Sequence, residues 1–276
     1  MQIIQKSLST SNYDTQATLT CYLKAPDEHA NQTALPALVF VPGGSYTHIP
    51  TQQAESIALA FAAQGFQCFV LRYSFTGEKK PLLPAPIIEL GLSIKLIRAN
   101  ANDWNIRPES INVMGFSVGG HIVSLYNDYW HTDWLVNAVH AQADLLKPNA
   151  IILGYPVIDF NLGFPPANTN LEQWTLEPDK YAAQKHVNQL NAPTFCWVTN
   201  DDTLVPVANS LAYCNALAQH QIPQELHIFH HGPHGLALAD QRTAWKQDAN
   251  QPHVAHWFQL AIEWLQDISA NPVKPE

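Results

Sequence analysis

Short, mainly apolar runs alternate with longer segments of helical spacing along most of this chain. The apolar runs predict strands buried in a sheet, at 37–41, 66–71, 111–114, 150–155, 194–198 and 225–229. Apolar residues three or four positions apart predict helices at 53–63, 87–101 and 254–268. This alternation predicts an α/β fold with a mostly parallel central sheet and helices on both of its faces.

Three stretches do not follow this alternation of short apolar runs and helical segments. Residues 17–23 alternate apolar and polar side chains, which predicts a half-exposed strand at the sheet edge. Residues 127–147 carry two tryptophans among polar side chains, and 159–191 are polar and rich in Pro and Asn. Each of these two stretches is a candidate cap or lid, with a plain surface excursion as the alternative. Because no repeat or linker divides the chain, residues 1–276 are predicted to form a single domain.

Composition and net charge limit which partners and which cellular location we expect. A charged content of 13% with 46% hydrophobic residues predicts a folded core, and a net charge of −9 argues against nucleic acid and anionic membranes as partners. No run approaches the ~18 apolar residues of a membrane span, and the first residues do not read as a signal peptide. Four cysteines without CxxC spacing predict reduced thiols in a cytoplasmic protein.

The first candidate chemistry lies directly after the predicted strand at 111–114. Gly115-Phe116-Ser117-Val118-Gly119 has the Gly-x-Ser-x-Gly pattern, and a predicted helix follows it. A buried strand, a sharp turn and a helix are the context of a nucleophile elbow, in which the serine points outward from a strained turn. Ser117 is therefore the candidate nucleophile, and a capping serine is the structural alternative.

A serine nucleophile needs a base and a carboxylate that orients it. Asp202 follows the predicted strand ending at 198, and His234 follows the one ending at 229, so both lie at the same sheet edge as Ser117. Asp201 competes with Asp202, and the Asp-x-x-Val-Pro spacing favours Asp202. His230 and His231 compete with His234, and the glycine that follows His234 favours that residue.

A glycine turn after the strand at 37–41 supplies candidates for an oxyanion hole. Backbone N–H groups in such a turn can point toward a developing negative charge, and each donor contributes roughly 3 kcal/mol to lowering the barrier. The expected donors are Gly44 and Ser45, together with Val118 directly after the nucleophile. An ordinary β-turn is the alternative.

Together these motifs resemble the α/β-hydrolase superfamily, and within it the small esterases related to acetylxylan and feruloyl esterases and to hormone-sensitive lipase. The resemblance spans most of the chain, at 42–46, 71–73, 104–108, 115–121, 202–206 and 234–235. It implies hydrolysis of short acyl esters, often acetyl groups on sugars, without a cofactor, and it carries Ser117, Asp202 and His234 over as a catalytic triad. Two departures are Val118, where the family usually has Ala, and Pro42, where it often has His.

Other function classes stay open at this point. His227, His230, His231 and His234, with two aspartates nearby, would suit a metal hydrolase, although no His-Glu-x-x-His helix is present and we expect no metal. A serine exopeptidase of the prolyl-peptidase type would share the serine, acid and histidine order. A non-enzymatic binding module is disfavoured because all three triad positions are filled.

Histidine content adds a prediction about assembly. Protonating all thirteen histidines would move the formal charge from −9 to +4. Surface electrostatics should therefore change between about pH 7 and 5, which predicts a pH-sensitive homo-oligomer. Solvated histidines without a switching role are the alternative.

Overall fold

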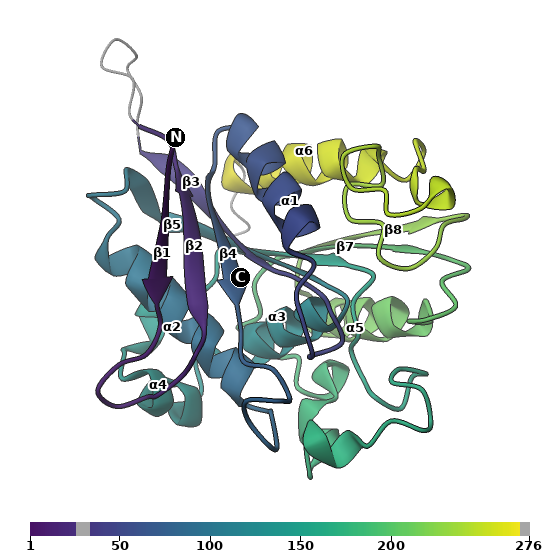
Figure 1. Ribbon diagram of the computed structural model, residues 1–276, viewed down its shortest axis with the longest axis horizontal. Coiled ribbons are helices and arrows are strands. Elements are labelled where there is room, and N and C mark those ends of the chain that lie inside the picture. The colour runs from purple at the N-terminus through teal and green to yellow at the C-terminus, as the bar shows by residue number, and fades with distance from the viewer. Residues whose placement is uncertain (26–33, 271–276) are drawn as a thin grey trace.

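The computed structural model describes residues 1–25 and 34–270, and its centre is an eight-stranded sheet (Figure 1). The strand order is β1-β2-β4-β3-β5-β6-β7-β8. Strands β3 to β8 run parallel, whereas β1 and β2 are antiparallel to their neighbours. The strands span Gln2–Ser7 (β1), Thr18–Leu23 (β2), Leu35–Val41 (β3), Gln67–Arg72 (β4), Ile106–Phe116 (β5), Ala150–Gly154 (β6), Thr194–Thr199 (β7) and Gln224–Phe229 (β8).

The predicted edge strand is the one element that the structure places differently. β2 covers the predicted segment 17–23 but is not at the edge, because β1 pairs with it on the outer side in the register Gln2 to Leu23. No strand was predicted at Gln2–Ser7. The residues of β1 are mostly exposed, so no buried apolar pattern marks them, and main-chain pairing with β2 holds the strand in place.

Two helical layers cover the sheet, as Figure 1 shows. Helices α1 and α6 lie on one face, and α2, α3 and α5 lie on the other. The short α4 packs beside α2. The helices span Thr51–Ala63 (α1), Ala85–Ala99 (α2), Val118–Tyr129 (α3), Asp133–Val139 (α4), Ala208–Gln219 (α5) and His256–Ala270 (α6). The predicted α/β architecture with helices on both faces is confirmed.

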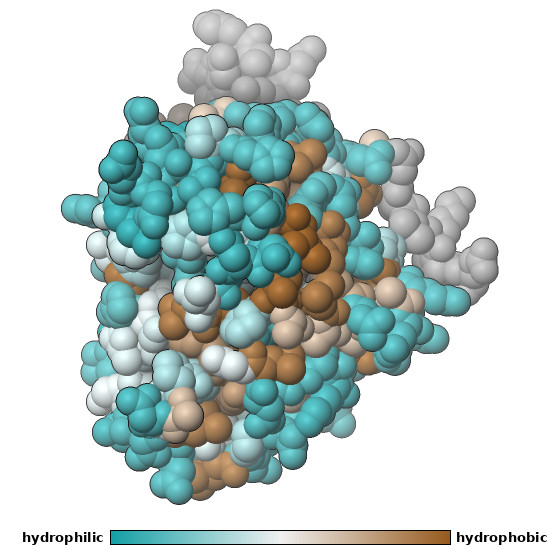
Figure 2. All heavy atoms as spheres, turned by 90° about the vertical axis from the view of Figure 1, so that its right-hand side faces the viewer, coloured by the Kyte–Doolittle hydropathy of each residue, from teal (hydrophilic) through white to brown (hydrophobic). Residues whose placement is uncertain are grey.

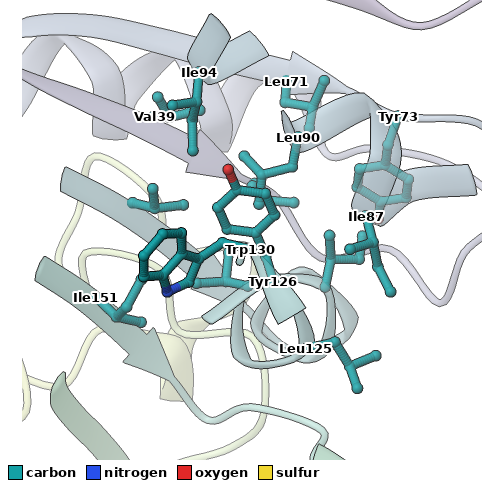
Figure 3. Close-up of a cluster of buried hydrophobic side chains, with 14 of the residues drawn as sticks. Val39, Leu71, Tyr73, Ile87, Leu90, Ile94, Leu125, Tyr126, Trp130 and Ile151 are labelled. Carbon is teal, nitrogen blue, oxygen red and sulfur yellow. The ribbon is translucent and has the colours of Figure 1, made fainter. Parts of the chain in front are cut away.

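The alternation of β3 divides the apolar core between the two layers. Val39 and its neighbours two positions away face α2 and α3, whereas Leu38 and Phe40 face α1 and α6. Figure 3 shows part of the first layer, in which Ile94 of α2 lies near Val39 and Leu90 lies near Leu71. Both faces of β3 are therefore packed, and the turn that follows it starts from a buried strand end.

The two candidate cap segments lie in different places. Residues 127–147 include α4 and pack against α2, where Lys95 Nζ donates to the carbonyl oxygens of Val139 and His140. Residues 159–191 lie at the carboxyl edge of the sheet, where the Trp174 ring packs 5.2 Å from that of Tyr46. The single domain over 1–276 and the role of either segment as a cap stay predictions.

A buried polar cluster ties α3 to α5. The Asp128 carboxylate is 1% exposed and accepts hydrogen bonds from Asn191 Nδ2 (2.6 Å) and the Tyr213 hydroxyl (3.0 Å), both on Oδ1. Its other oxygen, Oδ2, has no hydrogen-bond partner among the described residues. Burial raises the pKa of Asp128 well above its usual value.

Two observations concern the state of the cysteines and the length of the helices. All four cysteines are free and buried. Over the described ranges, none of the helices combines the length and apolar character needed to cross a bilayer. A cytoplasmic location stays a prediction.

Candidate active site

The sharp turn between β5 and α3 presents Ser117 at the carboxyl edge of the sheet. Its φ of 55° lies in the left-handed region, where a non-glycine residue is strained. A Cβ atom on Gly115 would lie 2.3 Å from the carbonyl oxygen of Gly119, and one on Gly119 would lie 2.0 Å from that of Val41. Both glycines of the motif are therefore required by the close approach of α3 to the sheet.

Ser117, His234 and Asp202 form a continuous chain of hydrogen bonds. The Ser117 hydroxyl lies 2.9 Å from His234 Nε2, and His234 Nδ1 lies 2.7 Å from Asp202 Oδ2. The side chain of Asp202 is fully buried, and its Oδ1 accepts the N–H groups of Leu204 and Val205. Since a carboxylate only accepts, His234 donates from Nδ1 and leaves Nε2 free to accept the serine proton.

The competing residues face elsewhere. Asp201 Oδ2 lies 2.5 Å from His231 Nδ1, and Asp201 Oδ1 accepts the N–H of Gly232. The Gly232 hydrogen bond and His231 lower the pKa of the Asp201 carboxyl. His230 is exposed. The loops after β7 and β8 thus hold two Asp–His pairs side by side, and only the pair of Asp202 and His234 contacts Ser117.

The candidate oxyanion donors lie on two neighbouring segments. The turn after β3 passes so close to the nucleophile that a Cβ atom on Gly43 would lie 3.0 Å from that of Ser117. In the part of the chain that the structure describes, the backbone N–H groups of Gly44, Ser45 and Val118 have no acceptor. Gly44 and Ser45 have φ values of 124° and 52°. The amides are therefore available to an oxygen bound beside Ser117.

A buried histidine ties this turn to α3. The Tyr46 hydroxyl lies 2.7 Å from His121 Nδ1, and His121 Nε2 lies 2.6 Å from the carbonyl oxygen of Tyr181. Burial lowers the pKa of His121 from 6.5 to about 4, so the ring is neutral at pH 7. Its Nε2–H then donates to Tyr181, and Nδ1 accepts from Tyr46. The contact joins the turn after β3, α3 and the segment 159–191.

Two cavities meet at His234. The smaller one, of about 200 Å³, contains Ser117, the turn 43–45, Phe116 and Tyr155 in its wall. The larger one, of about 830 Å³, is lined by the start of α1, by His234 and by residues 242–246. Figure 2 shows the molecule from the side at which the parallel strands end, and apolar surface gathers near the middle of this side among hydrophilic residues.

Sequence reasoning missed two aromatic residues of the site. The Tyr155 ring lies 4.8 Å from that of His234, and its hydroxyl accepts the N–H of Ala237. Because Tyr155 directly follows β6 at the carboxyl edge, its position after a buried strand was a usable signal. Trp245 lies in a polar stretch without periodicity, so nothing in the sequence indicated that it lines a cavity.

The histidines of the metal hypothesis do not converge on a common point. His227 pairs with Glu225 (2.6 Å), His231 pairs with Asp201, and His234 lies between Asp202 and Ser117. Within residues 1–25 and 34–270, no group of three or more His, Cys, Asp or Glu side chains is arranged to hold a metal ion.

Comparison with known proteins places this chain in a family. The model of the BD-FAE family matches residues 22–217. The chain is 30% identical to endo-1,4-beta-xylanase B of Butyrivibrio fibrisolvens over 77% of its own length and 34% of that protein. It is 26% identical to an acetylxylan esterase of Xylanibacter ruminicola over 92% of its own length and 48% of that protein. The chain thus spans a third to a half of the length of these curated relatives.

A solved structure agrees over the whole chain. The carboxylesterase Cest-2923 from Lactobacillus plantarum WCFS1 superimposes with a TM-score of 0.91 at 32% identity, covering 99% of this chain and 100% of that one. The fold is that of the α/β-hydrolases, which the chain shares with this carboxylesterase. Within that class, the chain belongs to the BD-FAE family.

Proposed function

We propose that this protein hydrolyses short-chain acyl esters, acetylated sugars among them, through an acyl-enzyme formed on Ser117. The observation that carries the proposal is the unbroken contact from Ser117 through His234 to Asp202, at 2.9 and 2.7 Å. A nucleophile within reach of a base, which is itself oriented by a carboxylate, is the arrangement that acyl transfer requires.

In the first half of the reaction, Ser117 Oγ attacks the ester carbonyl carbon. His234 Nε2 takes the hydroxyl proton, and Asp202 stabilises the resulting imidazolium while it holds the ring in place. The carbonyl oxygen gains negative charge and accepts hydrogen bonds from the N–H groups of Gly44, Ser45 and Val118. The carbon–oxygen bond to the alcohol then breaks, and the leaving alkoxide takes the proton from His234.

In the second half, water takes the place of the alcohol. His234 removes a proton from this water, and the hydroxide oxygen attacks the carbonyl carbon of the acyl-enzyme. The acid leaves when the bond to Ser117 Oγ breaks and His234 returns a proton to the serine. Since imidazole has to be neutral to act as a base, we expect activity to fall below roughly pH 6.

The size of the smaller cavity supports a short acyl group. Its volume of about 200 Å³ is below the roughly 300–1,000 Å³ of pockets that hold drug-sized ligands. The side chain of Val118, which directly follows Ser117, is fully buried in the apolar core and does not line this cavity, so the wall near Ser117 is formed by Phe116 and Tyr155 instead. An acetylxylan esterase among the relatives favours the acetyl group in particular.

Hydrolysis of p-nitrophenyl esters from acetate to octanoate tests this proposal, with wild type and Ser117→Ala compared in parallel. We expect kcat/KM to be highest for acetate and to fall at least roughly 10³-fold in the variant. p-Nitroacetanilide, the amide with the same acyl and aromatic groups, separates an esterase from a peptidase. Activity that survives Ser117→Ala, or faster amide than ester hydrolysis, contradicts the proposal.

A further inference from the structure

The larger cavity contacts only one member of the Ser117 chain of hydrogen bonds. His234 and Gly235 lie in the walls of both cavities, whereas Ser117 and the turn 43–45 line the smaller one alone. In acyl transfer, the acyl carbon bonds to the serine, while the alcohol oxygen receives its proton from the histidine. An alcohol half that passes His234 would therefore enter the larger cavity.

An exposed tryptophan forms part of the wall of that cavity. The Trp245 side chain is 59% exposed, and its indole Nε1 lies 3.8 Å from where a Cβ atom on Gly235 would be. The segment that carries it is fixed, because Gln53 Nε2 of α1 donates to the carbonyl oxygen of Thr243 (2.8 Å). Much of the indole is thus held open to solvent beside the residue that follows His234, and the Lys246 ammonium lies over one face of the ring, so a ligand stacks on the other face.

The charges on this wall are balanced in pairs. Arg242 Nη2 lies 2.5 Å from Asp240 Oδ2, and Lys246 Nζ lies 2.9 Å from Asp248 Oδ2 and 4.7 Å from the Trp245 ring centroid. Since each cation already has a carboxylate partner, the wall offers little net attraction to an anionic group. A neutral alcohol with its own hydroxyl groups suits it better than a phosphorylated or carboxylated one.

We propose that Trp245 is the platform on which the alcohol half of the substrate stacks, and that this half is a neutral pyranose ring. The C–H face of a sugar ring packs on an aromatic face, while its hydroxyl groups need polar partners at the rim. Gln52 and Thr203 provide such groups in the same cavity. The inference rests on the proposed function, because it assigns the second half of the same ester.

The test compares three acetyl esters that differ only in the alcohol. These are a methyl β-xyloside that carries one acetyl group and two free hydroxyl groups, ethyl acetate and phenyl acetate, assayed with wild type, Trp245→Ala and Trp245→Phe. For Trp245→Ala, we expect the ratio of kcat/KM for the sugar ester to kcat/KM for ethyl acetate to fall about fivefold to tenfold. The change should lie in KM, since stacking stabilises the bound substrate and the transition state alike. Trp245→Phe should keep most of the ratio.

Leu190→Ala is the matched control, because Leu190 is 51% exposed and lines neither cavity. An unchanged ratio in Trp245→Ala overturns the inference, as does a ratio that falls through kcat alone. A larger loss for phenyl acetate than for the sugar ester would assign the platform to an aromatic alcohol instead. Failure of the proposed function looks different, because wild type would then not hydrolyse ethyl acetate or Ser117→Ala would retain that activity.

Discussion

Asp201 and Asp202 are adjacent in the chain, yet their carboxylates contact different histidines. Asp202 is fully buried against His234, whereas the side chain of Asp201 is 44% exposed beside His231. Only His234 of the first pair contacts the candidate nucleophile, Ser117. The two residues therefore form a natural comparison, with the same chemistry and nearly the same place in the fold.

Replacing each aspartate by asparagine measures this difference. Asp202→Asn should lower kcat for p-nitrophenyl acetate by roughly 10³- to 10⁴-fold, because the amide no longer holds the required tautomer of His234. Asp201→Asn should leave kcat within about twofold of wild type, since screened surface pairs contribute little. Comparable losses in the two variants would contradict the assignment of Asp202.

Individual site residues were best predicted from the sequence where a motif fixes the spacing between them. Gly-x-Ser-x-Gly predicted Ser117 as a candidate, and strand ends predicted Asp202 and His234, because residues after parallel strands share one edge. The structure brings these three side chains into contact. The sequence could not reveal that Tyr46 bonds to His121, since that contact joins residues 75 positions apart through the packing of α3. The sequence did not predict the position of Trp245 either, because exposed loop residues follow no helical or strand periodicity.

At the scale of elements, most strands and helices followed from apolar spacing. β3, β4, β6 and β7 are buried on both faces, and their sequences read as short apolar runs. The prediction that residues 17–23 form the edge strand was wrong, because the outermost strand is β1, which is mostly exposed and is held by main-chain pairing with β2. Pairing across a sheet leaves no trace in the side chains of a solvent-exposed strand.

The cluster that joins α3 to α5 makes stability depend on pH. Because the folded-state pKa of Asp128 is raised, its contribution to folding is fully present below the usual value and is lost as pH rises through the folded-state value. Asp128→Asn keeps an acceptor for Asn191 and Tyr213 but cannot ionise. The variant should therefore gain free energy of unfolding relative to wild type as pH rises.

Urea unfolding at pH 5 and pH 8 measures that gain. The control is Asp103→Asn, which replaces an exposed aspartate before β5. We expect the difference between Asp128→Asn and wild type to be larger at pH 8 than at pH 5, and no such trend for the control. A difference that stays constant or shrinks would show that Asp128 is not a source of the pH dependence.

For the whole molecule, the histidines set how charge changes with pH. Because His121 is buried with a pKa of about 4, it stays neutral near pH 5. Protonating the other twelve adds twelve positive charges to −9 and gives at most +3. A pH-sensitive homo-oligomer stays a prediction on this basis. We expect the hydrodynamic radius from light scattering to differ between pH 7 and pH 5, and an unchanged radius contradicts it.

Ser117, Asp202 and His234 come together only after most of the chain has been synthesised. Ser117, Asp202 and His234 follow three different strands, and the segment after His234 is fixed by α6, whose Trp257 Nε1 donates to the carbonyl oxygen of Ala237 (3.0 Å). A nascent chain that ends before α6 therefore lacks this support for the segment that follows His234. On the proposed mechanism, a chain on the ribosome could assemble the sheet strand by strand and still hydrolyse no ester until this last described helix had docked.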